Sequence, residues 1–520
     1  MKNDPIIVIG AGVGGLVTAA LLAARGQNVM VLEAAAEPGG KMRRMMVDGD
    51  AIDGGPTVFT MRHVFDEIFA ACGGALENAV TMRPAHVLAR HAWGNDRLDL
   101  FADPTESEAA IGAFAGMRDA QGYRAFRAEA KRIFETLDTP FLRRGQTNPL
   151  GLTWRMGLRG FADLCAIRPY ESLWSALGDH FRDPRLRQLF GRYATYCGSS
   201  PFRCPATLML IAHVEASGVW LIDGGMHALA RALEELAQNN GARFRYNAPV
   251  REILTERGRA SGVILATGEH IAAHAVICNA DPAALAAGRF GPAVRKAVPA
   301  VPPARRSLGA LVWTARAKAE GFPLSRHNVF FSTDYPAEFA ALSSGTLAQS
   351  PSVYVCAQDR DDAGHIATTD GRERVQIIVN APPTGDSQRL TPAEIDTCTQ
   401  QMQASLSRAG LILDLPPGST QLSTPADFEA MFPSTGGALY GQASHGWAAS
   451  FRRPGARTRI PGLYCAGGST HPGAGVPMAA LSAFQAVECL LRDRASTSPS
   501  RQTAMPGGIS TPSAKTAASA

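Results

Sequence analysis

A glycine-rich turn near the N-terminus, followed by one acidic residue, is the first group of residues in the chain that could bind a ligand. The apolar run 6–9 leads into the turn, and a second apolar run, 28–32, leads into Glu33. This pattern predicts a buried strand, a tight turn, a helix and a second buried strand. The glycines of the turn are Gly10, Gly12, Gly14 and Gly15.

This order of elements suits the first βαβ unit of a dinucleotide site. Gly10 permits the tight turn, Gly12 lets the backbone approach a pyrophosphate, and Gly15 lets the helix pack closely on the strand. The phosphates then lie at the helix N-terminus, where unpaired N–H groups and the helix dipole favour negative charge. Glu33 stands 23 positions after Gly10, where a carboxylate accepts hydrogen bonds from a ribose diol. A glycine turn that binds nothing is the alternative.

A second glycine pair and a basic cluster follow Glu33 closely. Gly39 and Gly40 precede Lys41, Arg43 and Arg44. The segment resembles the extended flavin-binding segment of the glutathione-reductase-like flavoproteins, especially their amine oxidase and phytoene desaturase branch. This resemblance implies FAD rather than NAD, with the chain folding back along the cofactor and a basic residue meeting the pyrophosphate. The sequence does not choose among the three basic residues, and a solvated basic loop is the alternative.

The same resemblance implies further cofactor contacts. The segment 53–59 contains Gly55, Pro56 and Thr57 and is expected close to the flavin ring, although an ordinary loop could have the same composition. Glycine allows close backbone approach there, and proline fixes φ. Val250 matches the position whose backbone contacts the adenine end of the cofactor.

Near the C-terminus, residues 460–480 are predicted to run from a strand through a glycine-rich turn into a helix. A helix N-terminus aimed at the isoalloxazine would stabilise negative charge on the reduced ring. FAD would therefore be held by both ends of the chain. The cofactor-binding residues expected in this segment are Gly467, Gly468, Gly475 and Val476.

The composition of the whole chain argues against several other classes of protein. A net charge of +5 on 520 residues is too small to indicate nucleic acid binding. The nine cysteines are scattered and include no CxxC pair, which argues against a metal site and a disulfide framework. Residues 205–222 form the longest apolar stretch outside the N-terminal segment, but they are too short for a membrane span. No secretory signal is predicted.

The predicted elements indicate an α/β fold with three parts and a tail. The FAD-binding domain is Rossmann-like, of the glutathione-reductase-like type, and comprises 1–80, 240–300 and 455–494. Residues 104–235 form a helical subdomain, and residues 301–454 form an α+β substrate domain. The tail, 495–520, is rich in Ser, Thr, Ala, Pro and Gly and is predicted to be disordered.

Residues 143–159 form an irregular, basic stretch with interleaved apolar side chains, including Leu150 and Trp154. The mixture suits either a loop over the core or a lip that faces a membrane. We favour the lip because of the substrate that the family resemblance implies. The helical subdomain would then be the membrane-facing part of the chain.

Four segments narrow the resemblance to the bacterial phytoene desaturase family, which the chain resembles from about residue 5 to 492. These segments are 218–226, 279–281, 450–454 and 468–475. Two more, 53–62 and 437–447, are most similar to the hydroxyneurosporene desaturase branch of that family. The enzymes of this branch are also called methoxyneurosporene dehydrogenases or 1-hydroxycarotenoid 3,4-desaturases.

The resemblance implies an FAD-dependent oxidoreductase that introduces a C-3,4 double bond into a 1-hydroxy or methoxy acyclic carotenoid such as 1-hydroxyneurosporene. One hydrogen leaves as hydride to the flavin, and a neighbouring hydrogen leaves as a proton. Because the developing cation is delocalised along the polyene, the protein need supply little beyond orientation, a dry tunnel and the flavin. Reduced FAD would be reoxidised by oxygen, a quinone or another acceptor.

Such a substrate must come from a membrane or from another protein, because it is insoluble in water. We therefore expect a peripheral protein on the cytoplasmic side of the bacterial inner membrane, without a transmembrane helix. The resemblance also implies a source with a carotenoid pathway, as in bacterial photosynthesis.

No acid–base pair for the proton is visible in the sequence. His471 stands at the second glycine turn and could accept or relay the proton, because imidazole titrates near neutrality. A histidine that only caps the turn is the alternative. The weaker candidates are His213, Glu215, Asp223 and His445.

Three other functions share these motifs. An amine oxidase-like flavoenzyme has the same N-terminal architecture, but the segment 471–475 disfavours it. A carotenoid isomerase or a retinol saturase would use flavin without net desaturation or in the reducing direction. A non-catalytic prenyl-lipid carrier, such as the Rab-escort and GDP-dissociation-inhibitor proteins, shows that this fold does not fix the chemistry.

Overall fold

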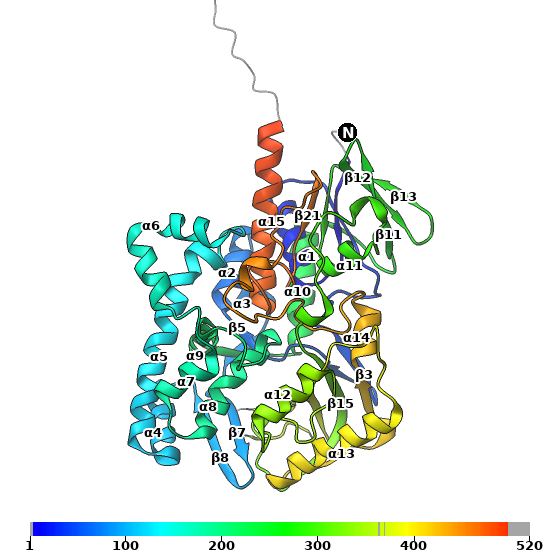
Figure 1. The fold of residues 1–520 in the computed structure, drawn as a ribbon. Coiled ribbons are helices and arrows are strands. Elements are labelled where there is room, and N and C mark those ends of the chain that lie inside the picture. The colour runs from blue at the N-terminus through cyan, green and yellow to red at the C-terminus, as the bar shows by residue number, and fades with distance from the viewer. Residues whose placement is uncertain (1–3, 362–363, 369, 498–520) are drawn as a thin grey trace, which may run out of the picture.

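A five-stranded parallel sheet, in the order β10-β2-β1-β14-β21, lies at the centre of the nucleotide-binding part of the protein (Figure 1). The structure is a computed structural model that describes residues 4–361, 364–368 and 370–497. Its strands are β1 (Ile6–Ile9), β2 (Val29–Leu32), β10 (Arg243–Arg245), β14 (Ala275–Cys278) and β21 (Leu463–Cys465). Strands from the start, middle and end of the chain therefore form one sheet.

Both faces of this sheet are covered, which is why its central strands are apolar throughout. Ile6 and Val8 of β1 face the core under α1 (Val13–Ala23), which packs against α10 (Met226–Asn239) and α15 (Val476–Thr497). Ile7 and Ile9 face an antiparallel meander on the opposite side. The meander comprises β11 (Val250–Glu256), β12 (Arg259–Leu265) and β13 (His270–Ala272).

A second, larger sheet has the order β19-β15-β18-β17-β16-β7-β8, with β20 paired to β15. One face packs on α13 (Pro392–Arg408). The sequence left residues 81–103 outside the predicted parts, but β7 and β8 extend this sheet because β7 pairs with β16. The strands are β7 (Val87–Trp93), β8 (Asp96–Phe101), β15 (Gly309–Glu320), β16 (His327–Phe330), β17 (Val353–Ala357), β18 (Glu373–Ala381), β19 (Ile412–Asp414) and β20 (Thr420–Ser423).

Helices fill most of the sequence between β8 and β9 (Val219–Ile222), and in Figure 1 they form the left side of the molecule. Asp183 and Pro184 separate two of these helices, because α7 ends at His180 and Asp183 caps the next helix by accepting a hydrogen bond from the Arg185 N–H at 2.8 Å. The α-helices are α4 (Pro104–Ala115), α5 (Met117–Leu137), α6 (Pro149–Ala166), α7 (Leu173–His180), α8 (Pro184–Gly191) and α9 (Leu210–Ala216).

Shorter elements join these parts. β3 (Arg44–Val47) pairs with β4 (Asp50–Asp53), and β9 lies between β5 (Phe59–Thr60) and β6 (Met82–Pro84). The remaining helices are α2 (Arg62–Ala71), α3 (Leu76–Ala79), α11 (Pro282–Ala287), α12 (Tyr335–Ser344) and α14 (Pro425–Met431).

The expectation of an irregular stretch over 143–159 is wrong from Pro149 onward, where α6 begins. Proline suits the first turn of a helix, and the Asn148 side chain accepts a hydrogen bond from the Gly151 N–H at 2.7 Å. Gly157, with φ of 71°, then interrupts the helix. At the C-terminus α15 continues to Thr497, three residues into the predicted tail, and residues 498–520 lie outside the described part of the chain.

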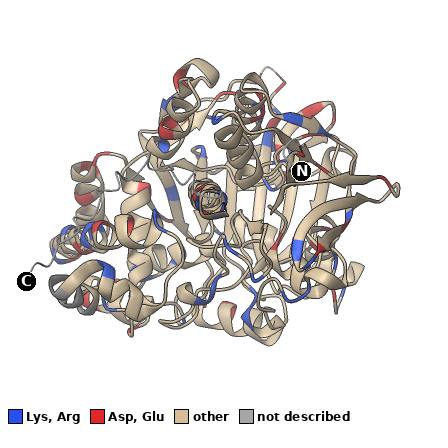
Figure 2. Cartoon of the chain, turned by 90° about the horizontal axis from the view of Figure 1, so that it is seen from above, with Lys and Arg blue, Asp and Glu red and all other residues tan. Residues whose placement is uncertain are grey.

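The described helices and the charge distribution in one view both bear on contact with a membrane. None of the helices within the described residues combines the length and the apolar character needed to cross a bilayer. In the view along α15, basic and acidic side chains are interspersed around the molecule (Figure 2).

Candidate cofactor and substrate site

The first glycine turn is crowded by the protein's own atoms. Gly10 has φ of 93°, and a Cβ placed on Gly15 would overlap the carbonyl oxygen of Gly10. A Cβ on Gly14 would lie 2.7 Å from the backbone nitrogen of Gly467. Glycine is therefore required at these positions by helix–strand packing, and the two glycine turns predicted from opposite ends of the chain are in contact.

The carboxylate of Glu33 points at the first turn. One oxygen accepts a hydrogen bond from the Ala11 N–H at 2.5 Å, and the other accepts from the Ala35 N–H at 2.8 Å. The adenine-side segment lies beside it, because the Ala248 N–H donates to the Glu33 carbonyl at 2.8 Å. Val250, two residues later, begins β11. An ionised carboxylate has spare lone pairs for a ribose diol.

The second glycine pair lies against the first turn. Gly39 forms a parallel bridge with Gly12, and its N–H donates to the Ala11 carbonyl at 2.9 Å. A Cβ on Gly40 would lie 3.2 Å from the Gly12 Cα. The chain therefore folds back here along the line where a pyrophosphate is expected.

Lys41 connects this segment to the loop expected near the flavin ring. A Cβ on Gly55 would overlap the Lys41 carbonyl oxygen, so the backbone of the segment containing Pro56 and Thr57 passes directly beside Lys41. The Lys41 ammonium donates to the Leu439 carbonyl at 2.6 Å. Burial lowers its pKa, an effect that Asp281 opposes.

Arg43 and Arg44 have partners away from the glycine turns. The Arg43 guanidinium donates to the Ser423 hydroxyl at 2.9 Å and lies over the Phe428 ring. Arg44 pairs with Glu37 at 2.9 Å. The structure thus gives Lys41 a place beside the predicted flavin loop and directs Arg43 toward β20 and α14.

The second glycine turn is open beyond Gly467, where a Cβ would lie 2.9 Å from the Asn279 side chain. Gly467, whose N–H donates to the Ser482 hydroxyl at 2.7 Å, has φ of 120°, and Gly475 has φ of 110°. A Cβ on Gly468 or Gly475 would meet no atom closer than 3.9 Å. Val476 then begins α15. A cradle of this kind leaves room for a flat ligand at a helix N-terminus.

A buried cation lies next to the open turn. The Arg453 guanidinium donates to the carbonyls of Gln442 at 2.6 Å and Tyr440 at 3.0 Å, and lies 3.4 Å from that of Gly468. Burial lowers its pKa. Arg453 thus ties the loop that carries Tyr440 to the second glycine turn and places positive charge beside it.

His471 lies at the same turn and anchors a distant segment to it. Its Nε2 is 2.9 Å from the Phe141 carbonyl and 3.0 Å from the Arg144 carbonyl, so it acts as the donor to both. Its Nδ1 is buried without a partner, and burial lowers the pKa of the ring to about 4. The contacts describe a tether, and proton transfer by His471 stays a prediction that would use Nδ1.

The weaker catalytic candidates do not come together. His213 contacts Phe134 on the outer helices, and Asp223 lines a charged pocket. His445 accepts a hydrogen bond from the Ser200 N–H at 3.0 Å. Glu215 is buried between the hydroxyls of Tyr193 and Tyr196. Within the described residues, no cluster of three or more His, Cys, Asp or Glu side chains could hold a metal ion.

The sequence analysis missed three hydrogen-bonded polar side chains beside residues 53–59, the loop that is expected near the flavin ring and is called the flavin loop below. The Thr57 hydroxyl is 2.6 Å from the Tyr354 hydroxyl, which is 2.8 Å from Nδ1 of His327. Thr57 and Tyr354 are half-buried, whereas His327 is buried and its Nε2 has no partner. These residues are separated by up to 297 positions along the chain, so no local pattern could have shown that they meet.

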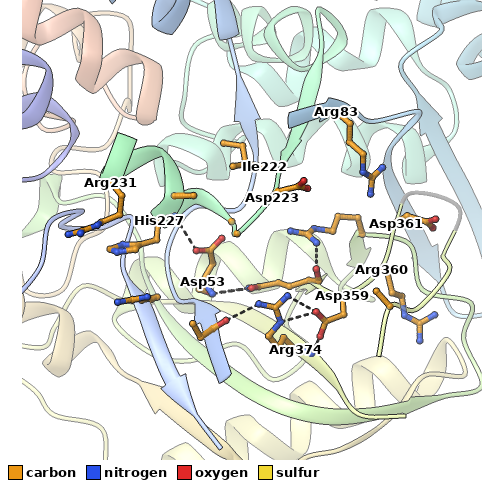
Figure 3. A pocket seen from close by; sticks show the side chains of 18 of the residues that line it. Asp53, Arg83, Ile222, Asp223, His227, Arg231, Asp359, Arg360, Asp361 and Arg374 are labelled. Carbon is orange, nitrogen blue, oxygen red and sulfur yellow. Dashed lines mark hydrogen bonds and ion pairs between the residues drawn. The ribbon is translucent and has the colours of Figure 1, made fainter. Parts of the chain in front are cut away.

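A charged pocket of about 710 Å³ is lined by residues of β4, α10 and the segment after β17 (Figure 3). Asp53 accepts hydrogen bonds there from the Met226 N–H at 2.7 Å and thereby caps α10. A Cβ on Gly225 would overlap the Asp53 carboxylate, which explains the glycine pair before α10. The pairing of Arg374 with Asp359 at 2.6 Å makes the pocket wall polar, so it does not suit a long apolar substrate.

Comparison with known proteins decides the family. Residues 13–380 match the family described as flavin containing amine oxidoreductase. The chain belongs to this family. The predicted FAD cofactor and the predicted oxidoreductase class are thereby confirmed, and the space at Gly468 and Gly475 fits a group of this kind.

Two relatives and one solved structure define the similarity more closely. The chain is 50% identical to hydroxyneurosporene desaturase of Rubrivivax gelatinosus over 99% of this chain and 98% of that protein. It is 44% identical to hydroxyneurosporene desaturase of Cereibacter sphaeroides over 95% and 98%. Putrescine oxidase bound to putrescine has a similar fold, with a TM-score of 0.56 and 15% identity over 95% of this chain and 99% of that one. The predicted membership of the carotenoid desaturase group and the mixed α/β fold are confirmed.

Proposed function

We propose that the chain is an FAD-dependent carotenoid desaturase that introduces a C-3,4 double bond into a 1-hydroxy or methoxy acyclic carotenoid such as 1-hydroxyneurosporene. The observation that carries the proposal is 50% identity, over nearly the whole of both chains, to a hydroxyneurosporene desaturase. The intact glycine turns and Glu33 favour an enzyme that retains its cofactor over a prenyl-lipid carrier.

When bound, the flavin supplies the acceptor for a hydride from the substrate. The residues of the chain orient the polyene and exclude water, and the cation that develops on the substrate is delocalised by its own double bonds. The proton then leaves for His471 Nδ1 or for solvent. The open turn at Gly468, the N-terminus of α15 and the nearby charge of Arg453 suit negative charge on the reduced cofactor.

The cofactor-binding set includes Lys41, Gly55, Pro56, Thr57 and Val250, in addition to the two glycine turns. Support comes from the way these segments converge, although they are distant in sequence. The FAD-binding domain is of the glutathione-reductase-like type and comprises 1–80, 240–300 and 455–494. The helical subdomain then comprises 104–235, and the substrate domain comprises 301–454 together with β7 and β8, which extend its sheet.

The membrane-facing part of the chain is α6 and the loop before it. Leu150 and Trp154 are 82% and 88% exposed, and the exposed Arg144 and Arg155 flank them. A groove of about 410 Å³ with an apolar floor on α15 opens beside Arg143. Exposed aromatic and aliphatic side chains among arginines favour the interface of an anionic bilayer, which supports a peripheral position on the cytoplasmic side of the inner membrane.

A liposome experiment tests this part of the proposal. The double variant Leu150→Glu, Trp154→Glu should bind anionic liposomes at least about 10-fold more weakly, because two apolar anchors are lost. Met117→Glu is the matched control, since Met117 is 69% exposed but lies at the turn between α4 and α5. Equal liposome binding by both variants would contradict the assignment of this face.

Expression in cells that accumulate 1-hydroxyneurosporene tests the reaction itself. The pigment should shift its absorption to the red, because desaturation lengthens the chromophore, and chromatography should show one new product. A colourless protein that takes up no FAD would instead support a carrier. Addition of oxygen or a quinone to the reduced enzyme would then identify the electron acceptor, which we propose is one of these.

A further inference from the structure

The substrate of the proposed reaction carries its only polar group very close to the bond that reacts. The oxygen is on C-1 and the new double bond joins C-3 and C-4, so the oxygen lies only roughly 4 Å from C-3, given carbon–carbon bonds of about 1.5 Å. A protein group that recognises this oxygen must therefore belong to the same wall of the site as the residues expected to hold the flavin. The far end of a substrate tunnel is too distant.

The face of the large sheet that lies behind the flavin loop carries such groups. Along β17, Val353 and Val355 point into the core under α13, whereas Tyr354 points to the opposite face, where it packs against the core of the nucleotide-binding part. On β18, Gln376 donates from its amide to the Gly55 carbonyl at 2.9 Å. The flavin loop is thus fixed directly onto this face of the sheet.

A hydrogen-bonded chain on that face consists of Thr57, Tyr354 and His327. The histidine at its end can form one further hydrogen bond. The Nε2 atom of His327 is buried without a partner, and so is the side-chain oxygen of Gln376. Buried polar atoms are nearly always paired in proteins, so an unpaired atom in a substrate-facing wall indicates a ligand or water. Burial, followed by the charges of Arg326 and Arg192, lowers the pKa of His327 to about 3, so the ring is neutral.

A neutral His327 lets the chain of hydroxyls run in either direction. With the proton on Nδ1, His327 donates to Tyr354 and Tyr354 donates to Thr57. The Thr57 proton is then available to a ligand, in competition with the Cys356 sulfur, which contacts both hydroxyls. With the proton on Nε2, each bond is reversed and Thr57 can accept from outside. Donation suits a hydroxyl or a methoxy oxygen alike, whereas a hydrocarbon end offers no partner.

We infer that the hydroxyls of Thr57 and Tyr354, polarised by His327, are the subsite that binds the C-1 oxygen of the carotenoid and sets the preference for oxygenated substrates. This inference rests on the proposed function. Thr57 and Tyr354 are specificity residues that touch the substrate, and His327 is a positioning residue that acts through Tyr354. A site built to bind an oxygen rejects an analogue that lacks it more strongly than an apolar pocket rejects a missing methylene.

The test compares purified enzymes on 1-hydroxyneurosporene and on neurosporene, the same chain without the oxygen, presented in liposomes. Thr57→Val and Tyr354→Phe should each lower the ratio of the two kcat/KM values by roughly 10-fold to 100-fold, because one hydrogen bond is lost. His327→Phe should also lower this ratio, which a purely structural role would not change. Thr57→Ser should restore it.

Two controls separate subsite loss from general damage. Thr314→Val removes a hydroxyl from a buried position in the same sheet, where it contacts the Gln421 carbonyl at 3.4 Å, and should leave the ratio unchanged. FAD content and the visible spectrum of bound flavin should match the wild type in the Tyr354, His327 and Thr314 variants, and the rates of the Thr57 variants are expressed per bound flavin because Thr57 also belongs to the proposed cofactor-binding set. Binding of the two carotenoids to enzyme held without an electron acceptor gives a second readout that does not depend on turnover.

The outcomes distinguish this inference from the proposed function. If the wild-type enzyme desaturates 1-hydroxyneurosporene with a clear preference and the Thr57 and Tyr354 variants keep that preference, the subsite is wrong and the function stands. If the wild-type enzyme fails to desaturate 1-hydroxyneurosporene, the proposed function is wrong as well. If the methoxylated substrate loses its advantage in Thr57→Val together with the hydroxylated one, Thr57 is confirmed as the donor.

Discussion

The two glycine turns that meet at the centre of the molecule use glycine for different reasons. In the first turn a Cβ at Gly15 would overlap the Gly10 carbonyl, and a Cβ at Gly14 would lie 2.6 Å from the Asn279 side chain. In the second turn a Cβ at Gly468 would meet nothing closer than 4.0 Å. Crowded glycines are required by the fold itself, whereas an open glycine that is not needed for packing indicates space kept for a ligand.

The largest effect should come from filling the crowded turn. Gly15→Ala forces α1 away from β1, and overpacking of this kind costs about 1–3 kcal/mol or more. We expect a protein that is recovered without FAD and unfolds at lower temperature, as measured by flavin absorbance and thermal denaturation. The control is Gly26→Asn, because Gly26 has φ of 70° with nothing within 4 Å and Asn tolerates that region. Equal FAD content in both variants would contradict the claim that the first turn requires glycine at position 15.

The stability of the protein should depend on pH through His471, which tethers the second glycine turn to the carbonyls of Phe141 and Arg144. Burial lowers the pKa of His471 from 6.5 to about 4. Between pH 6.5 and pH 4 this histidine is therefore protonated in the unfolded chain but neutral in the folded protein. The free energy of unfolding therefore contains a contribution from His471 of up to about 3 kcal/mol above pH 6.5, and this contribution is lost as the pH falls toward 4. His471→Gln keeps an N–H donor and should flatten this part of the stability curve in urea titrations. An unchanged slope would show that the ring is not buried as described.

The same substitution by glutamine also tests the proton relay. If His471 accepts the proton through Nδ1, turnover should fall at least about 100-fold while FAD content stays constant, because general base catalysis contributes that much. Stopped-flow measurement of flavin reduction gives the rate. Unchanged flavin reduction with full FAD content would leave His471 as a tether alone.

Filling the open turn should separate cofactor binding from folding. Gly468→Ala places a methyl group where no protein atom lies, so the FAD-free protein should unfold at the wild-type temperature. FAD should bind roughly 10-fold to 100-fold more weakly, since a misplaced ligand loses one or two hydrogen bonds. Isothermal titration of the FAD-free protein measures this. A lowered stability without any change in FAD affinity would assign the glycine to packing.

The smallest effect is expected at Glu33. Glu33→Gln keeps an oxygen for the Ala11 N–H but loses the charge, so FAD should bind about 10-fold more weakly, in line with a charge-assisted hydrogen bond. The control is Glu37→Gln, which removes the partner of Arg44 close by. Equal losses in both variants would mean that the net charge of the region, rather than Glu33 itself, governs affinity.

The comparison also explains what the sequence could predict. The first βαβ unit, the second glycine pair and the strand–turn–helix at 460–480 are local patterns, because each depends on residues within one turn and its flanking elements. The helix predicted at the end of the segment 460–480 is observed for the same reason, because α15 begins at Val476. Apolar spacing and glycine placement are sufficient where the neighbours in space are neighbours in sequence.

The remaining features depend on contacts between distant residues. The meeting of Thr57 with Tyr354, the capping of α10 by Asp53 and the tether from His471 to the Phe141 carbonyl join residues that are more than 170 positions apart. The helix α6 was missed for a different reason, because basic residues and Gly157 obscured its start at Pro149. No local pattern distinguishes a side chain that will find such a partner from one that faces solvent.

The parallel sheet is completed by its last strand in sequence, and this has a consequence for biosynthesis. During translation β1, α1 and β2 emerge early, but β21 and α15 follow more than 400 residues later. The early segments must therefore stay compact without their final neighbours while the rest of the chain is made. In the proposed cofactor site, FAD can be enclosed only after β21 and the second glycine turn have been made, so any truncation before β21 should yield a chain that the cofactor cannot rescue.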